Sequence, residues 1–136
     1  MIGPKEFCEY LVSQSEGSLG TIGQDIFYSQ SVDNPDNTIT VNPAPGYPAN
    51  PQVPISNLSF TIIVRDAVFD NGLDRVRQIA SLFRDENHIE RCNFYIADTF
   101  VYFLRFEQEP EGSFIGYDSS GRPEFSMNLA FHVIRG

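Results

Sequence analysis

Residues 124–135 read EFSMNLAFHVIR, a stretch in which every second residue is a large apolar one. Side chains of a β-strand point alternately to its two faces, so this pattern predicts a strand with one buried face. The buried set is expected to comprise Phe125, Met127, Leu129, Phe131 and Val133. The C-terminal stretch is therefore interpreted as a long strand of a sheet that has one apolar side.

Five shorter stretches predict the other strands. Residues 58–64 (LSFTIIV) are apolar on both faces toward their end, which favours a central strand. Residues 89–96 and 100–108 flank a tight turn and predict an antiparallel pair. Residues 25–30 and 38–41 are rich in β-formers and predict a β-hairpin across the acidic, turn-rich connection SVDNPDN.

Two segments have the apolar periodicity of helices. The first begins near Pro4 and ends by Gly17, and the second is expected to begin at a cap residue, Asn71. Residues three and four apart lie on the same face of a helix, which makes one apolar stripe on each. The expected buried stripes are Phe7, Cys8, Leu11 and Val12 on the first, and Leu73, Val76, Ile79, Ala80 and Phe83 on the second.

Between the hairpin and the central strand, residues 43–54 carry five prolines. Proline has no amide hydrogen and a fixed φ, so this segment is neither helix nor central strand. A loop of this length in a compact domain is either a binding arm or a surface connector, and the sequence favours neither. If it is an arm, Tyr47 is the natural anchor, with Pro45 and Pro48 as candidate contacts to a neighbouring subunit or partner.

Together these elements predict a single α+β domain, residues 1–136, built as a mainly antiparallel sheet with two helices packed on it and a long proline-rich loop. The net charge is −9, which argues against binding to a phosphate backbone. No stretch has the length and apolarity of a membrane span or a signal peptide, and the two cysteines lie far apart in sequence. We therefore expect free thiols, a reducing cytoplasm and no contact with a membrane.

The sequence has no motif typical of a catalytic, metal-binding or nucleotide-binding site. It has no phosphate-binding loop, nucleophile elbow or HExxH motif. A metal site could be formed by His88, Glu90 and Cys92, which alternate along a predicted strand, but no fourth ligand is near in sequence. A catalytic cysteine would need a base, and Cys92 has only His132 available. The alternating aromatics of residues 100–106 suggest a stacking surface, but acidic neighbours make core packing the better interpretation. We expect no catalytic site, no metal and no cofactor.

Three segments resemble the tail terminator and minor capsid proteins of long-tailed bacteriophages. The first is SFTIIVRDAVFDNGLDRVRQIASLF, residues 59–83, a strand that ends in Arg65 and leads into a helix. The second is NFYIADTFVYFLRFEQEP, residues 93–110, and the third is YDSSGRPEFSMNLAFHVIR, residues 117–135. The third has the family's closing pattern, here Asp118, Gly121, Arg122, Phe125 and Asn128.

The resemblance implies a structural virion protein that forms a ring, usually of six subunits, at the head-proximal end of the tail tube. Such a ring stops tube polymerisation, offers a docking face to the head connector, and lets DNA pass through its centre without specific binding. It implies assembly in the host cytoplasm, with the tail tube protein and a head completion protein as partners. An acidic chain is compatible with that role, because a repulsive lumen lets DNA slide.

Two other interpretations stay open. One is a different head–tail or neck completion protein or a tube subunit, and the other is a small ligand-binding or catalytic domain with a deep apolar pocket. Under the leading interpretation, Arg65 and Arg122 stand at a strand end and a turn, where arginine pairs bidentately with carboxylates. We expect these arginines and Asp118 to be candidate contacts, either within the subunit or across an interface.

Overall fold

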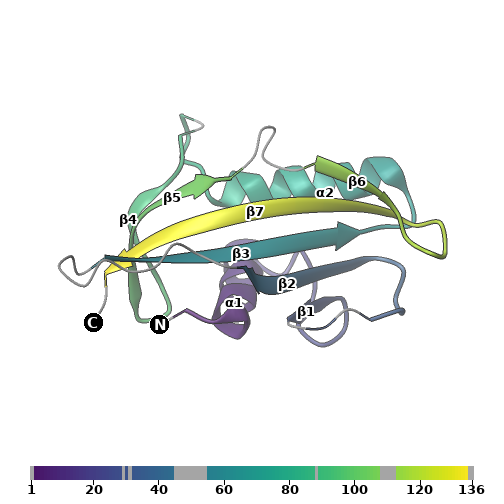
Figure 1. The fold of residues 1–136 in the computed structure, drawn as a ribbon, viewed down its shortest axis with the longest axis horizontal. Helices are drawn as coiled ribbons and strands as arrows, with labels where there is room; N and C mark the ends of the chain where they lie inside the picture. The colour runs from purple at the N-terminus through teal and green to yellow at the C-terminus, as the bar shows by residue number, and fades with distance from the viewer. Residues whose placement is uncertain are drawn as a thin grey trace.

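The computed structural model describes residues 2–28, 30, 32–44, 55–87, 89–107 and 113–134 (Figure 1). Within these residues the chain forms two helices and seven strands. The helices are α1 (Pro4–Gln14) and α2 (Phe69–Leu82). The strands are β1 (Ile26–Tyr28), β2 (Thr38–Ala44), β3 (Ile55–Arg65), β4 (Cys92–Ile96), β5 (Thr99–Phe106), β6 (Ser113–Tyr117) and β7 (Pro123–Ile134).

The sheet is organised around β7, as the alternation of residues 124–135 predicts. One side of β7 pairs antiparallel with β3, from Glu124 opposite Arg65 to Ile134 opposite Ile55. Its other side pairs antiparallel with β5 and, further toward its beginning, with β6. The strand order is β1-β2-β3-β7-β5-β4, with β6 joined to β7 off this path.

The expected α+β fold class is wrong in its architecture. The described chain is mostly one curled mixed sheet, a half-barrel, rather than a mainly antiparallel sheet with two helices packed on it. Register shifts in β5 and β6 contribute to the curl, because a bulge bends its strand and increases its twist. The helices fill the apolar side of this curled sheet.

The mixed character comes from β1, which pairs parallel with β2 and not as the expected hairpin. Tyr28, the last residue of β1, lies level with Val41. The chain then returns to the end of the sheet, where the carbonyl oxygens of Asp33 and Pro35 accept hydrogen bonds from Arg65. Since Arg65 is paired with Thr38 at the start of β2, the chain enters β2 in the same direction as β1. The connection is anchored by a distant arginine, which a local turn pattern does not reveal.

The core lies between the helices and one face of the sheet, and both helices lie behind β3 and β7 in Figure 1. Phe7 of α1 stacks on Phe60 of β3 with ring centroids 4.9 Å apart and meets the edge of Phe131 of β7 at 5.6 Å. Phe83, which follows α2, packs on Phe131 at 5.8 Å. Neither described helix has the length and apolar character needed to cross a membrane.

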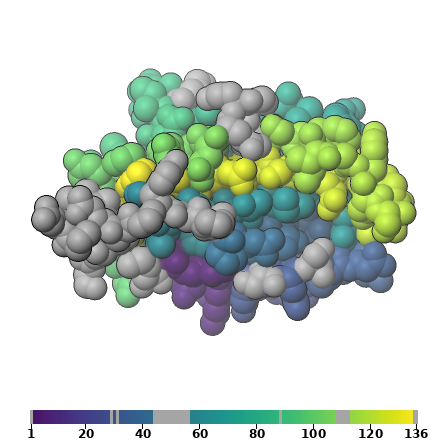
Figure 2. All heavy atoms as spheres, in the orientation of Figure 1, coloured from purple at the N-terminus to yellow at the C-terminus, as the bar shows by residue number. Residues whose placement is uncertain are grey.

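The opposite face of the sheet is polar. Thr61 on β3 donates a hydrogen bond of 2.8 Å to the side-chain oxygen of Asn128 on β7, its cross-strand neighbour. In the space-filling view, β3 and β7 form adjoining bands on this face and neither helix covers them there (Figure 2). The sheet therefore has one face in the core and one face turned outward, as an alternating strand requires.

The helix α2 begins two residues before the expected cap. Its N-cap is Val68, whose amide donates to the buried carboxylate of Asp66 at 2.9 Å. Asn71, the residue expected to cap, lies inside the helix. The expected stripe is otherwise correct, since Val76, Ile79, Ala80 and Phe83 are buried and Leu73 packs against the core.

The strand β5 does not alternate as expected. Its register shifts between Val101 and Phe103, so Val101 and Leu104 are buried while Tyr102 and Phe103 are exposed. A bulge adds one residue to one strand and moves every later side chain to the other face. The expectation that these aromatics serve core packing is therefore wrong for Tyr102 and Phe103.

We expect Ile79→Asp to unfold the protein or nearly so. Ile79 is fully buried, and an unpaired buried charge costs about 4 kcal/mol or more, a large part of the stability of a domain this size. Ser81→Asp, an exposed position in the same helix, is the control and should cost under about 1 kcal/mol. Urea denaturation of both variants checks this, and similar midpoints for the two would contradict the position of Ile79 in the core.

Candidate functional site

The turn between β6 and β7 is built around Asp118. Its Oδ1 accepts the amide hydrogens of Ser120 at 3.0 Å and Arg122 at 2.8 Å, and Gly121 supplies the left-handed backbone, with φ of 81°, that closes the turn. A short acidic side chain that binds amides two and four residues ahead holds such a turn without a large loop. The turn places the Arg122 side chain at the end of the sheet.

The guanidinium of Arg122 joins three carboxylates. Its Nε donates to Asp118 Oδ2 at 2.8 Å, its Nη2 to Asp33 Oδ1 at 2.9 Å, and its Nη1 to Asp36 Oδ1 at 3.2 Å. Nη1 also donates to the carbonyl oxygen of Asp33 at 2.6 Å. Arg122 is 8% exposed, and the side chain of Asp118 is also sheltered, whereas those of Asp33 and Asp36 are largely open to water. The bonds fasten the connection between β1 and β2 to the β6–β7 turn.

Arg65, at the end of β3, also fastens the connection between β1 and β2, but its acceptors are backbone carbonyl oxygens. Its Nη2 donates to the carbonyl oxygens of Pro35 at 2.7 Å and Asp33 at 3.3 Å, and its Nε to that of Asp36 at 3.2 Å. Arg65 is 5% exposed. The two arginines, which we call the arginine clamp, thus hold one loop from the end of β3 and from the β6–β7 turn.

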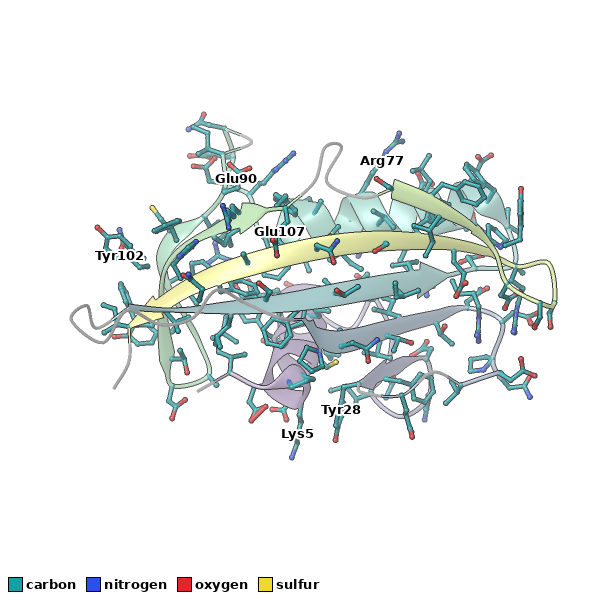
Figure 3. All side chains as sticks on the ribbon, in the orientation of Figure 1. Lys5, Tyr28, Arg77, Glu90, Tyr102 and Glu107 are labelled. Carbon is teal, nitrogen blue, oxygen red and sulfur yellow. The ribbon has the colours of Figure 1, made fainter. Side chains whose placement is uncertain are left out.

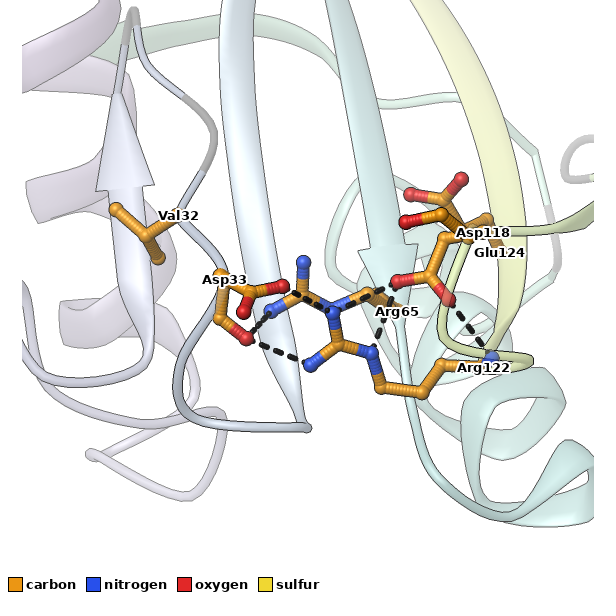
Figure 4. A pocket seen from close by; sticks show the side chains of 7 residues that line it. Val32, Asp33, Arg65, Asp118, Arg122 and Glu124 are labelled. Atoms are coloured by element: carbon orange, nitrogen blue, oxygen red, sulfur yellow. Dashed lines mark hydrogen bonds and ion pairs between the residues drawn. The ribbon is translucent and has the colours of Figure 1, made fainter.

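The arginine clamp borders a polar cavity of about 400 Å³ that is lined also by Asp118 and Glu124 (Figure 4). Hydrogen bonds lower the pKa of Asp118, and the bond from the Arg122 amide contributes most. Burial alone would lower the pKa of Arg122, but its bonds to Asp118 and Asp33 outweigh that cost and the pKa is raised. Both groups therefore stay charged, which suits a structural clamp and not proton transfer.

The residues that the sequence offered for nucleophilic chemistry are not brought together. Cys92 lies opposite Phe103, and Phe103 lies opposite His132 and stacks on its ring at 4.0 Å, so an aromatic ring separates the thiol from the imidazole. Burial raises the pKa of the Cys8 thiol to about 12, which keeps it protonated. Among the described residues no group of three or more His, Cys, Asp or Glu could hold a metal ion.

The structure brings together three of the six candidate contact residues, Arg65, Arg122 and Asp118, at one end of the sheet. Tyr47, Pro45 and Pro48 lie outside the described residues. Contact of any of the six with another subunit stays a prediction. Asp33 and Asp36, which sequence reasoning did not select, are the acceptors that complete the clamp. The acidic connection SVDNPDN was their signal, but the sequence alone did not link it to an arginine 89 residues away.

The family of the chain follows from a comparison with known protein families. Residues 15–134 match the model of the bacteriophage tail terminator protein family, and the chain belongs to this family. It is accordingly a structural protein of the phage tail, a part of the virion that associates with other tail components. No curated protein matches the chain.

The fold is shared with solved structures, among them two that align over most of this chain. A chain from the virion of a native gene transfer agent particle is 11% identical, with a TM-score of 0.53, and the match covers 91% of this chain and 84% of that one. A second solved protein is 9% identical, with a TM-score of 0.54, and the match covers 98% of this chain and 96% of the other. At these identities the likeness concerns the fold alone.

We expect Arg122→Ala to lower the melting temperature by roughly 5 °C or more, because it removes the donors that fasten Asp33, Asp36 and Asp118. Proteolysis should then begin between residues 32 and 37. Arg77→Ala, at an exposed position of α2, is the matched control and should melt like the parent. Equal melting temperatures for the two variants would contradict the clamp.

The lowered pKa of Asp118 predicts a specific pH dependence. A carboxyl group whose folded pKa lies below its unfolded value of 3.8 stabilises the fold fully above that value and loses the effect as pH falls through the folded pKa. The stability difference between the parent and Asp118→Asn should therefore be largest above about pH 5 and shrink toward about pH 2. Thermal melts across this range measure it, and a gap independent of pH would contradict it.

Proposed function

We propose that this chain is the tail terminator itself, a ring of six subunits at the head-proximal end of the tail tube. The ring stops polymerisation of the tube protein and presents a docking face to the head completion or connector protein. The observation that carries the proposal is the family match, which spans residues 15–134 and so includes every described strand.

The negative charge of the chain favours passage of DNA through the ring without binding. With 18 acidic residues against 9 basic ones, a ring of these subunits does not attract a phosphate backbone. Arg65 and Arg122, which line one pocket at the end of the sheet, are buried and bonded within the chain. DNA would pass through the lumen without specific binding, in a particle that assembles in the host cytoplasm.

The test is termination of tube growth. Purified protein is added to tail tube protein that polymerises in solution, and tube lengths are measured by electron microscopy. We expect rings at one end of each tube and tubes that stop growing in proportion to the protein added. Tubes whose length is unaffected, or long tubes formed by this protein alone, would contradict the proposal, and the second result would identify a tube subunit.

Pro43 and Ala44 belong to β2, which corrects the expected loop of residues 43–54, so the proline-rich segment that links β2 to β3 is residues 45–54. We propose that this segment reaches an adjacent subunit or the tube through Tyr47, Pro45 and Pro48. Prolines limit the conformations of the unbound chain and so reduce the ordering cost of such a contact. Replacing residues 45–54 by a glycine–serine segment of equal length should leave the melting temperature nearly unchanged but weaken capping. A replaced protein that caps as well as the parent would show that the segment is only a connector.

A further inference from the structure

Exposed aromatic side chains gather around β6 and the start of α2. Phe114 packs edge-on against Phe69 at 5.2 Å and Tyr117 at 5.2 Å, yet these three side chains are 44%, 39% and 64% exposed. Ile115, in the same strand, is 54% exposed but lies on the outer face of the sheet beside Ile63 and Glu124. We call Phe69, Phe114 and Tyr117 the β6 patch. Such a cluster on a protein surface marks an interaction site more often than a chance exposure.

A second group lies on β4, β5 and the end of β7. Tyr95 is 64% exposed and packs against Phe100 at 5.2 Å, while Tyr102 and Phe103 are 47% and 40% exposed and meet at 5.6 Å. We call Tyr95, Tyr102 and Phe103 the β4–β5 patch. The bulge in β5 is what turns Tyr102 and Phe103 outward.

The two patches lie at opposite ends of the long axis of the molecule. Figure 1 shows β6 at one end and β4 at the other, and Figure 3 places Tyr102 at the end away from β6. The register along β7 agrees, because Phe114 pairs with Phe125 and Phe103 pairs with His132, seven residues further on, which corresponds to roughly 23 Å of strand. Two different surfaces at opposite ends suit head-to-tail contact, which forms a ring when the rotation closes.

The charges beside the patches favour the same arrangement. Asp70 stands near the β6 patch on the first turn of α2, Asp118 in the β6–β7 turn and Glu124 at the start of β7, while Arg65 and Arg122 there are buried. Beside the β4–β5 patch, Arg105 follows Phe103 on the same face, with Asp98 in the β4–β5 turn and Glu107 after β5, so this end carries charges of both signs. Contact between two β6 patches would place acidic groups only against each other, whereas contact between unlike patches also brings Arg105 beside them.

We propose that the β6 patch of one copy of this chain docks on the β4–β5 patch of the next copy, in a head-to-tail interface. This inference rests on the proposed ring and names the surfaces that close it. Both patches border strands at an edge of the sheet, since β6 pairs only with β7 and β4 only with β5 among the described strands. The aromatic rings supply the apolar centre and the acidic and basic groups the rim, as in other protein interfaces.

The test uses two double variants with the same added charge. Phe114→Glu with Tyr117→Glu alters the β6 patch, and Tyr95→Glu with Tyr102→Glu alters the β4–β5 patch. Each should associate about 30-fold or more weakly than the parent and sediment as a monomer where the parent assembles. Tyr28→Glu, at an exposed tyrosine on the edge strand β1, is the control for a single added charge and should assemble like the parent.

The decisive sample is an equimolar mixture of the two double variants. Each variant keeps one intact patch, so head-to-tail docking predicts a complex of two subunits that cannot grow further, because the other junction would bring glutamates together. Either variant assembling like the parent, either forming dimers alone, or a mixture that stays monomeric would overturn the proposal. If a variant does not fold, as judged by its melting curve, the corresponding serine substitutions replace the glutamates.

The same samples separate this inference from the proposed function. If the parent assembles and the patch variants do not, but the parent leaves tubes uncapped, the result contradicts termination and supports the interface. A parent that caps tubes, with patch variants that still assemble, would retain termination and overturn the interface. A parent that stays monomeric both alone and on tube ends would overturn the interface.

Discussion

The pairing of β7 on both sides is the constraint on which the rest of the structure depends. Its twelve residues align β3 along one side and β5 and β6 along the other, so its apolar face sets the position of the core. Phe131 of this face meets Phe7, Phe60 and Phe83, which brings α1, the central strand and the end of α2 to one point. The outer face of the same strand carries Asn128 and His132 and stays polar.

Features decided by local periodicity could be predicted from the sequence, and features decided by distant partners could not. The alternation of Phe125 to Val133 and the helical stripe from Val76 to Phe83 gave the correct buried faces, because each reflects a single element against the core. The parallel pairing of β1 depends on Arg65 and Arg122 holding Asp33 and Asp36, and the exposure of Tyr102 depends on one bulge. The strand β6 was also missed, since its short stretch reads as a turn-rich connection.

The candidate site, too, has residues that the sequence could identify and partners that it could not. Arg65, Arg122 and Asp118 could be selected from their places at strand ends and turns, and the structure gathers them into one clamp with bonds to the β1–β2 connection. Arg65 and Arg122 are buried and bonded within the subunit, and the exposed aromatics at the two ends of the molecule are the surfaces that we propose for assembly. A subunit with exposed aromatic patches at its two ends, and with an internal arginine clamp at one of them, suits a closed ring in a phage tail.

The most direct test of the proposed ring is a cryo-electron microscopy map of the neck of virions that contain this chain. We expect one ring of the chain between the tail tube and the head connector, with β6 of each subunit facing β4 and β5 of its neighbour. Density for the chain in many stacked rings along the tube, or its absence from the neck, would contradict it.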